Sequence, residues 1–101
     1  MVARAGPAQA PVVSLAQMTA ALALYHYDSC PYCRMVRRAI DRLGIAVELR
    51  NIDDDPEHLR ALMQARGRRT VPVLRIEGPE GTTWMPESAD IVRYLEQRSS
   101  V

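Results

Sequence analysis

The sequence predicts an α/β fold in which a four-stranded mixed sheet is flanked by helices, with the elements in the order β-α-β-α-β-β-α. Three features predict it: short apolar runs alternate with helical patterns, two of these patterns end at a glycine, and residues 78–81 form a turn between two strands. A strand–helix–strand repeat predicts parallel neighbours, whereas a short turn joins antiparallel strands. The sheet is therefore expected to contain both kinds of pairing.

The size and composition of the chain are those of one globular domain. It has 101 residues, of which 48% are hydrophobic and 25% are charged. The formal net charge of +1 argues against a nucleic-acid partner and against a polybasic membrane anchor. No apolar run approaches the roughly 18 residues that a membrane span needs. Two cysteines cannot form the disulfide framework of a small secreted scaffold.

The first half of the domain is expected to hold two strands around one helix. A run of apolar and aromatic residues predicts a strand over 22–27, and alternation predicts another over 47–52. Between them, a helix is predicted over 33–43, and Gly44 suits the left-handed conformation that follows a helix. The apolar residues of this helix recur at a spacing of three and four: Val36, Ala39, Ile40 and Leu43.

The second half is expected to hold a helix, a hairpin and a final helix. Asp55 is expected to cap a helix that begins with proline and ends at Gly67. Strands are predicted over 71–76 and 82–85, and Ser88 is expected to cap the last helix. The inner faces of the two helices are expected to consist of Leu59, Leu62, Met63, Ile91, Val92 and Leu95.

The beginning of the chain differs from the rest in composition. Residues 1–21 are expected to form a flexible or partly helical N-terminal extension, and residues 22–101 to form the folded domain. Ala8-Gln9-Ala10 is similar to a signal-peptide cleavage site, but no apolar run precedes it. We therefore expect no secretory signal and a cytoplasmic location.

Both cysteines lie in Cys30-Pro31-Tyr32-Cys33, where the first strand gives way to the first helix. Cys30 is expected at the helix N-terminus, where unpaired backbone N–H groups and the positive end of the dipole favour a thiolate. Three arginines in the first turns add positive potential. We expect Cys30 to face solvent and attack a disulfide, and Cys33, shielded inside the helix, to resolve the mixed disulfide.

Three other interpretations of the cysteine pair compete with a redox role. Half of a zinc site would need two further ligands, and His26 and His58 are expected on separate elements that do not converge. A structural disulfide would close too short a loop to stabilise the fold much. Buried, inert thiols fit poorly with the polar Asp28 and Ser29 that precede the motif. A Cys-x-x-Cys pair beside a βαβ pattern favours redox chemistry, so no metal site is expected.

With this motif the sequence resembles the glutaredoxins, a branch of the thioredoxin-like fold, over residues 22–98. The Cys-Pro-Tyr-Cys motif matches the dithiol glutaredoxin active site, and Thr70-Val71-Pro72 matches the Thr-Val-Pro of that family. Two motifs at a suitable separation, inside the expected order of elements, make the resemblance specific. It implies a thioredoxin-like fold and a redox activity that uses glutathione.

The resemblance also implies how glutathione would bind. It implies a cis peptide bond before Pro72, which leaves the backbone of Val71 free to pair with the cysteinyl part of glutathione. The residues alone would favour an ordinary trans proline at the start of a strand. Many glutaredoxins have a lysine where Tyr27 stands here. Arg69, with Arg68 as the alternative, is the expected substitute for binding the glycine carboxylate.

Residues 85–90 depart from the usual glutaredoxin pattern and are similar to the Glu-Ser motif of glutathione S-transferase N-terminal domains. The resemblance implies that Glu87 pairs with the ammonium of the γ-glutamyl group, while Ser88 and nearby backbone N–H groups receive its carboxylate. Alternatively, Ser88 only caps the last helix and Glu87 only complements its dipole. Tyr32 is expected to pack beside the bound tripeptide, and Trp84 to belong to the core or its rim.

Together these features predict a glutathione-dependent thiol–disulfide oxidoreductase that reduces protein disulfides and glutathione mixed disulfides through Cys30 and Cys33. Glutathione is its expected co-substrate, with no permanently bound cofactor. We expect a monomer whose partners are glutathione and glutathionylated or disulfide-containing proteins, with neither nucleic acid nor membrane involved. Two alternatives stay open. One is a stand-alone domain of the glutathione S-transferase N-terminal type, and the other is a glutathione or iron–sulfur binding module without turnover.

Overall fold

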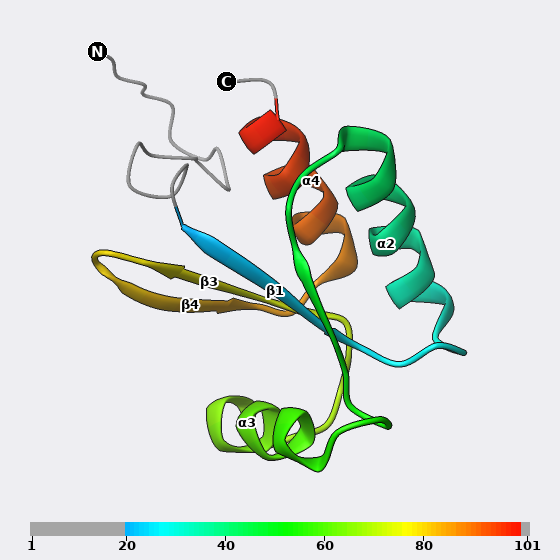
Figure 1. The fold of residues 1–101 in the computed structure, drawn as a ribbon, viewed down its shortest axis with the longest axis vertical. Helices are drawn as coiled ribbons and strands as arrows, with labels where there is room; N and C mark the ends of the chain where they lie inside the picture. The colour runs from blue at the N-terminus through cyan, green and yellow to red at the C-terminus, as the bar shows by residue number, and fades with distance from the viewer. Residues whose placement is uncertain (1–19, 100–101) are drawn as a thin grey trace.

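The computed structural model describes residues 20–99 (Figure 1). Within this range the order of elements is the expected one. The extension was expected over residues 1–21; residues 1–19 of it lie outside the described residues, whereas Ala20 is buried in the core and Ala21 begins the first strand, so the folded domain begins earlier than residue 22. The strands and helices are β1 (Ala21–His26), α2 (Pro31–Leu43), β2 (Glu48–Asn51), α3 (Pro56–Arg66), β3 (Val73–Gly78), β4 (Gly81–Met85) and α4 (Ser88–Ser99).

The four strands form one mixed sheet in the order β2-β1-β3-β4. β1 and β2 are parallel, with Tyr25 opposite Arg50. β3 is antiparallel to β1, with Val73 opposite Tyr25, and β4 is antiparallel to β3, with Met85 opposite Leu74. The prediction of a parallel pair extended by an antiparallel hairpin is confirmed.

Helices cover both faces of the sheet (Figure 1). Because successive side chains of a strand point to opposite faces, Leu22 and Leu24 of β1 join the core under α2 and α4, whereas Ala23 and Tyr25 join the core under α3. The first core is the larger and includes the fully buried Tyr94. Helices on both faces of a four-stranded mixed sheet are the arrangement expected from the sequence.

Local sequence signals explain where α2 and α3 begin and end. Each helix follows an N-cap residue in extended conformation, Cys30 or Asp55, and has a proline in its first turn. Each ends at a glycine with a left-handed backbone, at φ 67° for Gly44 and φ 72° for Gly67. The predicted boundaries at Gly44, Asp55 and Gly67 are confirmed, whereas α2 begins at Pro31, two residues before the predicted start at residue 33.

Several expectations are wrong at positions where tertiary packing, rather than the local sequence, determines the structure. Met63 was expected on the inner face of α3 but is 42% exposed, because α3 covers only part of its sheet face and Leu62 alone is fully buried. β3 starts at Val73 rather than at residue 71. Ser88 is the first residue of α4 rather than its cap, since the N–H of Ile91 already donates to the carbonyl of Glu87 at 2.9 Å.

Candidate functional site

The three predicted motifs come together at one end of the sheet. β1 runs toward this end and leads to Cys30, while β3 is antiparallel to β1 and starts there, directly after Pro72. β4 also runs toward this end and leads to Glu87 and Ser88. The end lies at the right-hand side of the sheet in Figure 1. Strand direction therefore brings segments from residues 30, 72 and 87 into one region.

Cys30 occupies the N-cap position of α2, with φ −79° and ψ 116°. Its Sγ accepts a hydrogen bond from the backbone N–H of Cys33 at 3.3 Å, and its carbonyl accepts one from Arg34 at 3.0 Å. The first turn of α2 contains no acidic residue. The sulfur thus lies against the positive end of the helix with no carboxylate of that turn in competition.

The expectation that Cys30 faces solvent is wrong, because only 4% of the residue is exposed. The sulfur accepts the N–H of Cys33, and the whole residue is buried at the start of α2. The neighbouring Tyr32 is 62% exposed, so the surface beside the thiol is open although the thiol itself is covered.

Cys33 is fully buried, as predicted for the second cysteine. Burial raises the pKa of its thiol from 9.0 to about 12, and a hydrogen bond with the Cys30 side chain adds to the increase. The Arg37 guanidinium acts in the opposite direction on this pKa. Both cysteines are free thiols in the structure, and the pair combines a sulfur at a helix cap with a protonated one behind it.

Arg37 organises the approach to the cysteines in a way that the sequence analysis missed. Its guanidinium lies 3.2 Å from Asp28 Oδ1 and 3.4 Å from Nδ1 of the buried His26. Asp28 Oδ1 also accepts from Asn51 Nδ2 at 3.3 Å. Burial, followed by the charge of Arg37, lowers the pKa of His26. The spacing of four residues places Arg37 one helical turn after Cys33, but no signal in the sequence indicated its contacts with the loop before the helix.

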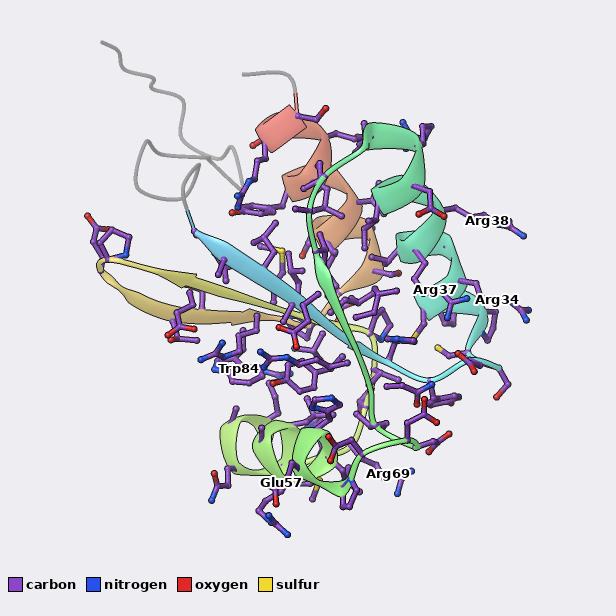
Figure 2. The ribbon with its side chains drawn as sticks, viewed as in Figure 1. Arg34, Arg37, Arg38, Glu57, Arg69 and Trp84 are labelled. Carbon is purple, nitrogen blue, oxygen red and sulfur yellow. The ribbon has the colours of Figure 1, made fainter. Side chains whose placement is uncertain are left out.

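The other two arginines near the motif behave differently from Arg37. Figure 2 shows Arg34 and Arg38 extending outward from α2, whereas Arg37 turns back toward the loop that precedes the helix. Among residues 20–99, neither Arg34 nor Arg38 has an ion pair. They are therefore surface cations, and Arg37 is part of the framework of the site.

The segment before β3 has the backbone geometry that the resemblance implied. The peptide bond between Val71 and Pro72 is cis, and Pro72 is buried. Within the described range, the loop and turn hydrogen bonds leave the backbone of Val71 unused. Thr70 is exposed, and the side chain of Arg69 is 60% exposed and lies 3.7 Å from Asp53. Arg69 is thus near the site but already has an anionic neighbour.

Glu87 and Ser88 lie at the start of α4, at the same end of the sheet. Glu87 is exposed, and its carboxylate has no ion pair within residues 20–99. Ser88 is half-buried in the first turn, where backbone N–H groups lack intrahelical partners. A negatively charged group is stabilised at such a helix end.

Trp84 belongs to the core rim, as predicted. Its ring packs against Tyr25 at 5.4 Å, and the guanidinium of Arg75 lies 5.7 Å from its centre. His58 also packs on Tyr25, at 6.3 Å and edge-on, and lies 3.7 Å from Asp55.

In the described part of the chain, no three histidine, cysteine or acidic side chains come together as a metal site would require. No helix of that part is long and apolar enough to cross a membrane.

Comparison with known proteins agrees with the geometry. Residues 24–100 match the family described as the N-terminal domain of glutathione S-transferases. The chain belongs to this family. Its thioredoxin-like fold and its resemblance to glutaredoxins are confirmed by the relatives and structures that follow.

Glutaredoxin 2 of Escherichia coli strain K12 is 37% identical over 75 residues, which make up 73% of this chain and 32% of the relative. The glutaredoxin of Ricinus communis is 32% identical over 89 residues and is covered over 87% of its length. The crystal structure of Salmonella typhimurium glutaredoxin 2 in complex with glutathione superposes with a TM-score of 0.59 and 34% identity, over 75% of this chain and 33% of that one. The chain thus spans about a third of the glutaredoxin 2 relatives that it matches.

Proposed function

We propose that this protein is a glutathione-dependent thiol–disulfide oxidoreductase that reduces glutathione mixed disulfides and protein disulfides through Cys30 and Cys33. The observation that carries the proposal is the difference between the environments of the two sulfurs. Cys30 Sγ accepts a backbone N–H at the start of α2, whereas Cys33 is fully buried and its pKa is raised to about 12. Dithiol exchange needs one nucleophilic sulfur and one protonated sulfur in reserve.

Reduction of a glutathione mixed disulfide needs only Cys30. The Cys30 thiolate attacks the glutathione sulfur, a bond forms between these two sulfurs, and the substrate leaves as a thiolate that takes up a proton. A second glutathione thiolate then attacks the glutathione sulfur held on Cys30. This step releases oxidised glutathione and restores the Cys30 thiolate, so that one free glutathione is consumed for each substrate thiol released.

Reduction of a protein disulfide needs both cysteines. Cys30 attacks one sulfur of the substrate, and the other leaves as a thiolate that takes up a proton. Cys33 then loses its proton, attacks Cys30 Sγ and releases the second substrate thiol, which leaves a disulfide between Cys30 and Cys33. Two glutathiones reduce that disulfide. Arg37, whose charge lowers the pKa of Cys33 against the effect of burial, assists the loss of its proton.

Glutathione is proposed to bind along the end of the sheet at which the three motifs meet. The Val71 backbone would pair with its cysteinyl part beside Cys30, while Glu87 and Ser88 hold its γ-glutamyl end. The unused carboxylate of Glu87 and the start of α4 support the latter contact. The glutathione complex of the related Salmonella protein supports glutathione as the ligand.

Three further residues are proposed to contribute contacts to the same ligand. Tyr32 and Thr70 are both exposed next to the motifs and would flank the tripeptide. Arg69 would bind the glycine carboxylate in exchange for Asp53. We infer a monomer that works in the cytoplasm, where the glutathione pool keeps thiols of such proteins mostly reduced.

A coupled assay tests the proposal. The full chain is mixed with glutathione, glutathione reductase, NADPH and the mixed disulfide of glutathione and cysteine. We expect NADPH oxidation that requires both the protein and glutathione. Absence of turnover with a folded protein would contradict the proposal.

The second candidate is transfer of glutathione to an electrophile, which the family match and the Glu87-Ser88 pair favour. An assay with chlorodinitrobenzene as the electrophile distinguishes the two activities. An oxidoreductase that depends on Cys30 gives no conjugate above the background rate, whereas a transferase forms conjugate and keeps this activity in the Cys30→Ser variant.

A further inference from the structure

A cavity lies between α3 and the sheet, on the face away from α2 and α4. Its volume is about 310 Å³, at the lower end of the range for small-molecule sites. Ala61 and Ala65, one helical turn apart on α3, form its helical side, and their short side chains leave the space open. Figure 2 shows Trp84, which also lines the cavity, on the same side of the sheet as α3. The cavity is thus separate from the end of the sheet where the three motifs meet.

The sheet side of the cavity consists of two aromatic rings and two guanidinium groups. The rings of Tyr25 and Trp84 lie 5.4 Å apart and are tilted by 43°. Arg50 is paired opposite Tyr25 in the sheet, and its guanidinium lies 5.5 Å from the centre of that ring. Arg75 is paired opposite Trp84 in the same way, at 5.7 Å. Strand pairing and cation–π contacts therefore hold both cations in place over flat rings.

The cavity has a positive lining. Arg50 and Arg75 both line it, Gln64 adds an amide, and none of the described residues that line it is acidic. Glu48 pairs with Arg50 at 3.0 Å and Glu77 pairs with Arg75 at 2.7 Å, but both carboxylates are exposed and lie outside the lining. Exposed ion pairs of this kind are weak. The two guanidinium groups can therefore accept a further anion on their cavity side.

The hydrogen bonds of Arg50 are incomplete. One terminal nitrogen donates to the hydroxyl of Tyr25 at 2.7 Å, and the other donates to Glu48 at 3.0 Å. The Nε–H group is buried and has no acceptor within residues 20–99. A buried N–H group without an acceptor is unfavourable, and a carboxylate suits a guanidinium because it accepts two parallel N–H bonds. An oxyanion toward which this guanidinium turns would supply the missing acceptor.

We propose that this cavity binds a small aromatic carboxylate, a single flat ring that bears one carboxylate group. The carboxylate would pair with the guanidinium groups of Arg50 and Arg75, and the ring would lie against Trp84 and the methyl groups of the two alanines. A neutral ring would leave the guanidinium groups without an anion, and a carboxylate without a ring would leave the methyl groups uncovered. The binding does not rest on the proposed function.

Three small molecules test the proposal on the full chain by NMR. Benzoate has both the ring and the charge, benzamide has the ring alone, and acetate has the charge alone. We expect benzoate to shift the methyl resonances of Ala61 and Ala65 and the indole N–H of Trp84, which is the only tryptophan of the chain. The shifts should saturate with a dissociation constant of about 1 mM or lower, as suits a ligand of so few atoms. Benzamide and acetate should bind about tenfold more weakly or less.

Two variants change the cavity in different ways. Arg75→Gln removes one cation and is expected to weaken benzoate binding by about tenfold. Ala65→Leu keeps both arginines but fills the space, and it should weaken binding by a similar factor; leucine is a good helix former, so α3 is retained. Arg60→Gln is the matched control, because Arg60 is an exposed arginine of α3 that pairs with Glu57 and lies outside the cavity. It should leave the affinity unchanged.

Several outcomes would overturn the proposal. Equal binding of benzoate and benzamide would show that charge is not recognised, and full affinity in Ala65→Leu would place the ligand elsewhere. Shifts confined to residues 87 and 88 would place the anion at the start of α4 instead. The Cys30→Ser variant separates this proposal from the proposed function. It should lose turnover and keep its affinity for benzoate, whereas persistent turnover would contradict the proposed function alone, and lost affinity would contradict a separate cavity.

Discussion

Helices α2 and α3 both follow an N-cap residue in extended conformation, have a proline in the first turn and end at a left-handed glycine. They differ in the atom at the cap. In α3, the exposed carboxylate of Asp55 accepts the N–H of Glu57 at 2.9 Å. In α2, the buried sulfur of Cys30 accepts the N–H of Cys33 at 3.3 Å.

The first turns of the two helices also differ in charge. Glu57 adds a second negative charge at the start of α3, whereas the first turn of α2 contains no acid. The positive end of the α3 dipole thus interacts with the acidic side chains of that helix start. The positive end of the α2 dipole has no acidic side chain in its first turn and faces the Cys30 sulfur. One local pattern therefore places a carboxylate at the start of one helix and a sulfur, the proposed nucleophile, at the start of the other.

The largest expected effect comes from changing the cap atom of α2. Cys30→Ser keeps a capping oxygen but removes the nucleophile, so turnover in the coupled assay should fall by on the order of a thousandfold or more. The free energy of unfolding in urea should change little. Asp55→Ser, the matched change at the other cap, should leave the activity intact.

The second prediction separates the two sulfurs. Cys33→Ser should retain most of the activity toward a glutathione mixed disulfide, because a second glutathione completes that reaction. It should lose reduction of protein disulfides that need both thiols. Assays of both substrates on one preparation check this, and loss of both activities in a folded variant would refute the division of labour.

The third prediction makes the first turn of α2 resemble that of α3. Arg34→Glu introduces an acidic side chain near the start of α2 and should destabilise a thiolate at Cys30 by about 0.3–1 kcal/mol. This corresponds to a roughly two- to fivefold slower alkylation by iodoacetamide. Arg34→Gln should show a smaller decrease, since it removes a charge without reversing it. An unchanged rate in both variants would mean that the charge of the first turn is immaterial.

The smallest effect concerns α3 alone. Asp55→Ala removes the capping carboxylate that binds the N–H of Glu57 and should lower the free energy of unfolding by about 1 kcal/mol. Urea titration measures this loss. The rate of Cys30 alkylation should stay at the wild-type value, and a slower rate would show that the two helix starts are not independent.

The features that could be predicted from the sequence are those set by neighbours along the chain. The N-cap at Asp55 and the helix ends at Gly44 and Gly67 depend on local backbone geometry, so the residue pattern of each helix predicts them directly. The cis bond before Pro72 has no such local signal, and only the resemblance to glutaredoxins predicted it. The positions of the two cysteines relative to α2 followed from the strand-to-helix junction.

The features that were missed depend on contacts between elements. The exposure of Met63 depends on how much of the sheet α3 covers, and the burial of Tyr94 depends on how α4 meets α2. Arg37 turned toward Asp28 because the loop before α2 folds alongside the helix, which a helical pattern does not reveal. Cys30 is likewise only 4% exposed although it lies at the start of a helix, and the local pattern of the helix start did not predict this burial.

The most direct test asks which of the two sulfurs reacts first. The reduced protein is treated at neutral pH with one equivalent of iodoacetamide, and peptide mass spectrometry locates the label. We predict that the label lies on Cys30 and that Cys33 stays unmodified well into alkaline solution, because burial raises its pKa to about 12 and keeps it protonated. A label on Cys33, or one divided equally between the two cysteines, would contradict the account.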